Sequence, residues 1–257
     1  MLLKIIVCLI AGIGAGLGIG FVGMTATAVI TPMLMSFLGM APYQAISVSL
    51  VCDAVASAVG AMTYRKSGNI DMKNGLFMMA VVLAFTLVGS WLSKLASSSM
   101  LGGGSVVTTF IFAAKFLIWP VKNAENAKSD ASEKSRILKI LVFGTLIGLI
   151  CGFFGAGGGV MILLVLTSLM GYELKTAVGT SLLIMAASAL TGAIGHFVIG
   201  GVPELLALVL CVLSTTLAAR LAAKYANKAD PIVLNRIAGG FLLVLGIIIV
   251  VIQKVSV

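Results

Sequence analysis

Long apolar stretches separated by short polar ones run along the whole chain and fall into two sets of five. In the first set they cover 5–22, 24–38, 42–64, 74–96 and 101–120, and in the second 137–154, 156–170, 174–198, 203–225 and 231–253. A helix of about 20 apolar residues is long enough to cross the hydrocarbon core of a bilayer. The pattern therefore predicts an all-α polytopic membrane protein.

The two sets are related by an internal repeat. Moving the sequence by 132 residues places Gly12 on Gly144 and Gly20 on Gly152, and between positions 12 and 72 it gives 17 identities in 61 positions, seven of them glycine. Glycine recurs where a backbone needs unusual dihedral angles or close approach. We therefore expect two halves with a common backbone plan, as in transporters whose site lies between repeats.

The first two apolar stretches of each half meet at a glycine-rich point, and the second of them is only about 15 residues long. Short segments interrupted by glycine, in matching places of both halves, are typical of broken or re-entrant helices. If each pair forms a hairpin that enters and leaves on one side, the halves are inverted relative to each other. If each pair forms one discontinuous span, the halves are parallel.

Charge distinguishes these two topologies. The inverted one places 13 of the 17 lysines and arginines on the cytoplasmic side and three outside, with Lys115 inside a span, whereas the parallel one gives 10 against six. The tendency of basic residues to stay inside favours the inverted topology. We expect a first membrane repeat at 1–120, a cytoplasmic linker at 121–136, a second repeat at 137–257, and both termini outside, in the cytoplasmic membrane.

The amino-acid composition and the motifs argue against several other classes of protein. The chain is 60% hydrophobic and 10% charged, against about 25% charged residues in soluble domains. The net charge of +9 gathers in loops beside apolar spans, which indicates membrane orientation rather than nucleic-acid binding. The four cysteines are scattered without metal-ligand spacing, so we expect no metal and no cofactor. Walker-type, HExxH and GxSxG motifs are missing from the sequence, which argues against an ATP-driven pump or a hydrolase.

Candidate binding residues lie where the hairpins turn. The free N–H groups and positive dipole end of a helix that starts inside the membrane can bind an anion without a buried lysine or arginine. Small residues alone can equally serve tight helix packing. Hydroxyl residues at matched places early in the third segments can bond an anion or their own helix carbonyls. The candidate substrate-binding residues are Gly23, Thr25, Thr27, Ser49, Gly157, Gly158, Gly159, Thr180 and Ser181.

Two ionisable residues are candidates for proton coupling. Asp53 is the only acid well inside a long span, and an intramembrane carboxylate is a functional candidate by default. It can take up a proton, pair with Lys115, or make a structural hydrogen bond. His196, the only histidine, lies near the outer end of its span, where it can carry a proton or act as an interfacial anchor. Their repeat partners are Met185 and Tyr64.

An ordered set of residues in both halves resembles the TauE/SafE family of sulfite exporters. The second half carries Gly157-Gly158-Gly159, the run from Ala177 to Leu182, and Gly200-Gly201-Val202. The first half carries Ser49-Leu50 and Gly68-Asn69-Ile70-Asp71. The chain departs from the family pattern in having Thr25-Ala26-Thr27 where glycines are common, and Leu164 where a proline is common.

The resemblance implies a secondary transporter, not an enzyme, that moves a small sulfur-containing anion such as sulfite or an organosulfonate across the cytoplasmic membrane. The expected partners are that anion and the lipid bilayer, with a homodimer as a further possibility. Two alternatives stay open. One is a cation carrier that uses Asp53, and the other is a membrane-embedded assembly factor that transports nothing.

Overall fold

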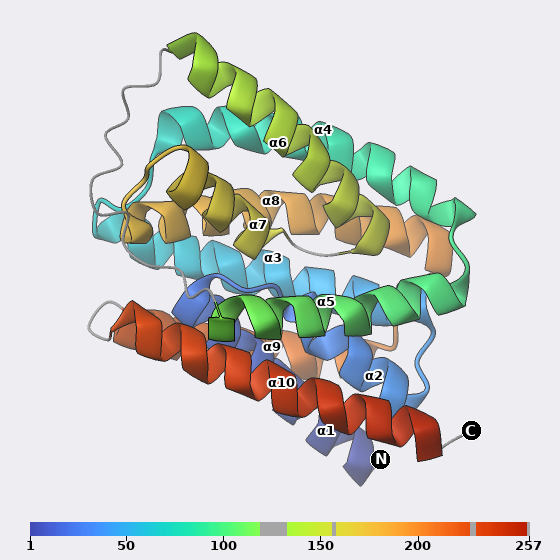
Figure 1. Ribbon diagram of the computed structural model, residues 1–257. Helices are drawn as coiled ribbons and strands as arrows, with labels where there is room; N and C mark the ends of the chain where they lie inside the picture. The colour runs from blue at the N-terminus through green and yellow to red at the C-terminus, as the bar shows by residue number, and fades with distance from the viewer. Residues whose placement is uncertain (119–132, 156–157, 227–229, 256–257) are drawn as a thin grey trace.

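Helices make up nearly all of the computed structural model, which describes residues 1–118, 133–155, 158–226 and 230–255 (Figure 1). The helices are α1 Leu2–Val22, α2 Ile30–Leu38, α3 Pro42–Lys66, α4 Met72–Leu92, α5 Ser98–Ile118, α6 Glu133–Phe154, α7 Gly159–Leu164, α8 Leu174–Gly200, α9 Leu205–Ala226 and α10 Pro231–Val255. Single 3₁₀ turns lie at Ala26–Ala28 and Ser93–Leu95, and a π-helical turn at Val165–Leu169 extends α7. The described residues form no strand.

The predicted all-α polytopic membrane fold is confirmed. Six helices in the described part of the chain, α1, α3, α4, α6, α8 and α9, are long and apolar enough to span a membrane. Large aliphatic side chains such as Leu87, Leu213 and Val244 are more than half exposed on the outside of the bundle, as expected of a lipid-facing surface. Helix α6 begins at Glu133, within the stretch 121–136 that we expect to be the linker, and the rest of that stretch lies outside the described residues.

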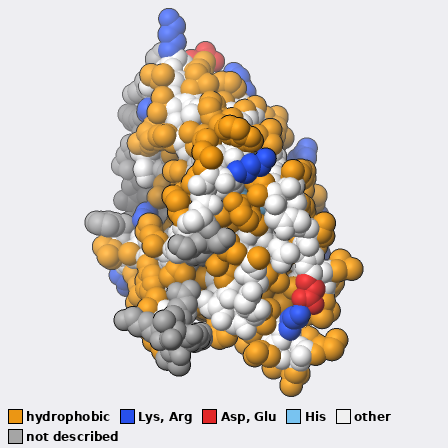
Figure 2. Space-filling model, turned by 90° about the vertical axis from the view of Figure 1, so that its right-hand side faces the viewer, with side chains coloured by type: hydrophobic (Ala, Val, Ile, Leu, Met, Phe, Trp, Pro, Cys, Tyr) orange, Lys and Arg blue, Asp and Glu red, His pale blue; other side chains and the backbone are white. Residues whose placement is uncertain are grey.

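The two ends of the bundle differ in charge. Figure 1 shows both chain termini and the turn between α4 and α5 at one end, and the turn between α3 and α4 at the other. Figure 2 looks onto the first end, which is mostly hydrophobic or uncharged and carries the ion pair between Lys4 and Glu204. The opposite end has Arg65 and Lys66 in the last turn of α3 and Lys224 in the last turn of α9.

The helices pair in a pattern that the 132-residue offset leaves unchanged. α1 packs along α9, and its counterpart α6 packs along α4, while α3 pairs with its counterpart α8 and α5 with its counterpart α10. A Cβ on Gly20 would lie 2.5 Å from the carbonyl oxygen of Ala219, and one on Gly148 would lie 2.6 Å from that of Val82. These glycines therefore allow close helix contact. Other glycines on the same two seams are Gly12, Gly16, Gly89, Gly144 and Gly152.

Candidate functional site

The segments that interrupt the two hairpins lie against each other inside the bundle. We call residues 23–27 the first break and residues 155–159 the second break; of the latter, 156–157, including the candidate Gly157, lie outside the described residues. Each break follows a full-length helix, α1 or α6, and precedes a short helical arm. Non-helical backbone at membrane depth is tolerated only where protein buries it or where it lines a cavity. The described residues of both breaks are accordingly buried.

The two breaks run past each other in opposite directions. The hydroxyl of Thr27 donates a hydrogen bond of 2.7 Å to the carbonyl oxygen of Gly155. At the other end of the contact, a Cβ on Gly159 would collide with the carbonyl of Gly23. Gly23 and Gly155 have φ angles of 67° and 65°, a left-handed conformation that favours glycine. Candidate residues from both halves therefore meet at one place, as the repeat suggested.

Asp53 holds the first break. It lies in the middle of α3 and is fully buried. Its Oδ1 accepts a hydrogen bond of 2.6 Å from the backbone N–H of Ala26, and its Oδ2 accepts one of 2.5 Å from the hydroxyl of Thr25. The Thr25 oxygen in turn accepts a bond from the N–H of Thr27. Hydrogen bonds thus connect the carboxylate through both threonines to the second break.

The second break has small and sulfur-containing neighbours instead. A Cβ on Gly158, which has a φ of 73°, would lie 2.5 Å from the sulfur of Cys151, and a Cβ on Gly159 would lie 2.5 Å from the sulfur of Met185. Met185 is the repeat partner of Asp53. The same position on α3 and α8 therefore faces a break in both halves, but only α3 supplies a charge there.

The three hydroxyl candidates from the third segments lie at different places in the structure. Ser181 lies beside the first break, because a Cβ on Gly23 would be 3.5 Å from its oxygen. Ser49 instead lies within 2.7 Å of the hydroxyl of Thr31 and donates to its own helix at Ala45. Thr180 accepts a bond from the backbone N–H of Asp71, at the end of the bundle. Of these three candidates, only Ser181 reaches the breaks.

His196 lies where the second break begins. Its ring is fully buried, so the residue is not an interfacial anchor. Nε2 is 3.1 Å from the carbonyl oxygen of Gly152, in the last turn of α6, and Nδ1 makes no hydrogen bond to any described residue. The ring of Tyr43 lies at a centroid distance of 5.7 Å. His196 therefore supports the end of α6 from α8.

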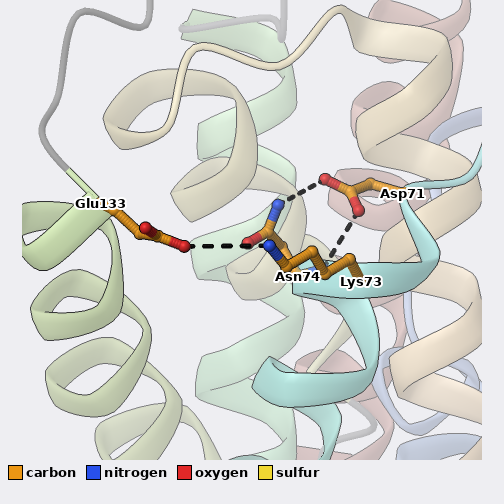
Figure 3. A network of polar contacts seen from close by, with 4 residues as sticks. All are labelled: Asp71, Lys73, Asn74 and Glu133. Carbon is orange, nitrogen blue, oxygen red and sulfur yellow. Dashed lines mark hydrogen bonds and ion pairs between the residues drawn. The ribbon is translucent and has the colours of Figure 1, made fainter.

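Asp71 is a structural residue to which the sequence analysis gave no role. Its carboxylate caps α4 by accepting bonds from the N–H and side-chain amide of Asn74, and it accepts a 2.5 Å bond from the hydroxyl of Tyr172, just before α8. Figure 3 shows the cap beside the long ion pair between Lys73 of α4 and Glu133 of α6. An aspartate directly before an apolar segment is the sequence signal for such a cap.

The arrangement at the breaks already binds an oxyanion. Two donors, the Thr25 hydroxyl and the Ala26 N–H, point at one carboxylate deep in the bundle. Charge-assisted bonds of this kind are the stronger hydrogen bonds in proteins. A sulfite or sulfonate oxygen presents the same acceptor chemistry as the Asp53 carboxylate. Among the described residues, no group of three histidine, cysteine or acidic side chains is placed to hold a metal ion.

Comparison with known proteins identifies the family of the chain. The family model described as sulfite exporter TauE/SafE matches residues 8–249. Two proteins of Bacillus subtilis (strain 168), each named a probable membrane transporter protein, are similar to the chain. YdhB is 26% identical and the match covers 86% of this chain and 89% of YdhB; YunE is 26% identical with 81% and 84% covered. No solved structure matches. The chain therefore belongs to the TauE/SafE family and is a membrane transporter rather than an enzyme.

Proposed function

We propose that this protein is a secondary transporter of a small sulfur-containing anion, sulfite or an organosulfonate, across the cytoplasmic membrane. The observation that carries the proposal is the carboxylate of Asp53, held by an N–H and a hydroxyl of the first break. The substrate binds beside it, between the first break and Gly158 and Gly159 of the second, with Ser181 at the edge.

Asp53 and the substrate compete for the same donors. While the carboxylate is charged, it occupies the Thr25 hydroxyl and the Ala26 N–H and repels a second anion. A proton on Asp53 removes that charge and weakens its hold on both donors, so the substrate takes them. Binding of the anion therefore requires uptake of a proton, which makes the two move together. His196 is the second candidate for the proton, through its Nδ1.

Alternating access follows from two inverted repeats. The counterpart helices α3 and α8 pack antiparallel. Gly60, late in α3, faces Leu182, early in α8. Leu50, early in α3, faces Gly192, late in α8. A two-fold axis perpendicular to the helices relates such pairs, and inverted halves have that symmetry. One half then rocks against the other around the breaks. This topology keeps both termini outside, which a reporter fused after Val257 tests directly. The homodimer stays a prediction.

Flux of labelled sulfite into proteoliposomes tests the proposal. We expect saturable uptake that an imposed proton gradient accelerates. Asp53→Asn keeps an oxygen and an amide for the same two partners but carries no titratable proton, so it should still exchange anions while losing the acceleration. Glu173→Gln removes one exposed acid and is the matched control. Unchanged acceleration in Asp53→Asn would refute the coupling, and no anion flux in folded wild-type protein would refute the substrate.

The alternative of a cation carrier has less support from the geometry. A cation needs acceptor oxygens around it, whereas the Thr25 hydroxyl and the Ala26 N–H donate to the Asp53 carboxylate. A flux assay separates the two functions, because neutralising Asp53 abolishes transport of a cation that it binds but leaves anion exchange intact.

A further inference from the structure

A cavity of about 410 Å³ lies between α5, α6 and α7, and Phe154 and Val160 of its wall flank the second break. Among the described residues that line it, Lys115 on α5 has the one charged side chain, and the others are apolar. Several of its lining residues also belong to the outer surface, because Val107, Ile111 and Ile150 are 56%, 58% and 41% exposed. In a membrane protein such a surface contacts lipid, so the cavity is open to the bilayer from the side.

The corresponding helices of the other half differ in their contacts. There α10 packs on α1, and a Cβ on Gly14 would lie 2.5 Å from the ring of Phe241. The repeat partner of Phe241 is Thr109, and the partner of Lys115 is Ile247. The charge at the position of Lys115 is therefore specific to the α5 side.

The position of Lys115 along α5 indicates which kind of ligand the cavity can bind. It lies three residues before Ile118, the last residue of α5, at the end of the bundle that carries Arg65 and Lys66. A lysine near the end of a span extends its ammonium group toward the headgroups while its methylenes stay in apolar surroundings. An acidic headgroup at Lys115 would place an acyl chain of the same molecule along the apolar wall.

We propose that this cavity is a binding site for an anionic phospholipid, with its phosphate at Lys115 and one acyl chain between α5, α6 and α7. Basic pockets between transmembrane helices bind acidic headgroups in this way. Val160 and Leu164 of α7 form part of the wall, and α7 is the arm that follows the second break. A bound chain therefore packs directly on the hairpin that lines the proposed substrate site.

Thermal melting of the purified protein in detergent, with increasing phospholipid, tests the site without any transport. Phosphatidylglycerol should raise the melting temperature at lower concentration than phosphatidylcholine with the same chains, and soluble glycerol phosphate should not raise it. Lys115→Gln should need about five times more phosphatidylglycerol for the same shift, the effect expected of one basic residue near a membrane surface. Lys115→Arg should keep the preference.

Two further variants keep the test informative if Lys115→Gln does not fold. Ile111→Trp places a large ring at the mouth of the cavity and should weaken the effect of phosphatidylglycerol, whereas Val244→Trp, on the exposed face of α10, should not. Equal effects of the two lipids on wild-type protein, or an undiminished preference in Lys115→Gln, would overturn the site, as would an equal shift by glycerol phosphate. None of these outcomes bears on sulfite flux, so this site and the proposed transport function fail independently.

Discussion

The two hairpins share one backbone plan but are held at different places. The first hairpin is fixed at its break, where Asp53 binds Thr25 and Ala26. The second is fixed at its base, where the Tyr172 hydroxyl donates to Asp71 and the Lys139 ammonium donates to the carbonyl of Leu169. At the described residues of the glycine-rich second break, α8 supplies no carboxylate, since Met185 stands in the place of Asp53.

Because the two breaks differ, each can serve a different function. In a symmetric repeat, both breaks would have to serve both functions. A break held by a buried carboxylate has a fixed geometry and a site for a proton. A break of glycines whose described residues are held by the Thr27 hydroxyl at Gly155, and by no carboxylate, can change conformation at a smaller cost in buried hydrogen bonds. We infer that the first break supplies the charge chemistry, and that the second break moves during transport.

The largest effect is expected at the contact between the breaks. Gly159→Leu places a side chain where the carbonyl of Gly23 lies, and a backbone group cannot turn away as a side chain can. We expect a loss of stability at or above the upper end of the usual about 1–3 kcal/mol for an overpacked core. Melting temperature and the yield of monodisperse protein measure it. Gly240→Leu, with nothing within 4 Å of its Cβ, is the control, and equal behaviour of the two would show that the breaks are not in close contact.

The second effect compares Asp53 with its repeat partner. Asp53→Leu leaves the Thr25 hydroxyl and the Ala26 N–H without their acceptor inside the bundle, and each such buried group costs about 1–3 kcal/mol. Met185→Leu is a volume-conserving change that should cost less than about 1.5 kcal/mol. Chemical denaturation of both variants measures the difference. If Met185→Leu destabilised the protein as much as Asp53→Leu, the proposed asymmetry of the breaks would be wrong.

The sequence predicted the helical segments and their breaks better than the hydrogen bonds between side chains. Apolar length and the glycine repeat were sufficient to predict the ten segments and the position of both breaks, because helix length and glycine spacing are local properties. The partners of Thr180 and Ser49 were not predictable, because a hydroxyl inside a membrane bonds whichever acceptor or donor the tertiary packing brings near. Thr180 reaches Asp71 only because α8 crosses the start of α4.

The third effect tests the base of the second hairpin. Partial burial alone would raise the pKa of Asp71, but the hydrogen bonds from Tyr172 and Asn74 outweigh it and hold the pKa below its ordinary value. A lowered pKa in the folded protein means that the stabilisation is present at neutral pH and is lost as the pH falls through that value. Asp71→Asn should therefore cost about 1 kcal/mol at pH 7 and make melting less sensitive to acid than in the wild type. If Asp71→Asn lost melting temperature at low pH as steeply as the wild type, the acid sensitivity would come from other carboxylates.

The smallest effect separates the bond between the breaks from the bonds within the first break. Thr27→Val keeps the shape of the side chain but removes the donor to Gly155, and one hydrogen bond contributes about 1 kcal/mol. If the second break moves during transport, this bond has to break in each cycle, so Thr27→Val should lower the melting temperature yet leave sulfite flux equal or faster. Thr31→Val is the control for a lost hydroxyl elsewhere in the same hairpin. The hydroxyl of Thr31, in α2, pairs with that of Ser49. A Thr27→Val variant that folds but transports more slowly than Thr31→Val would instead make the Thr27 hydroxyl a substrate ligand, and the first break would then bind the anion with its side chains as well as hold the proton.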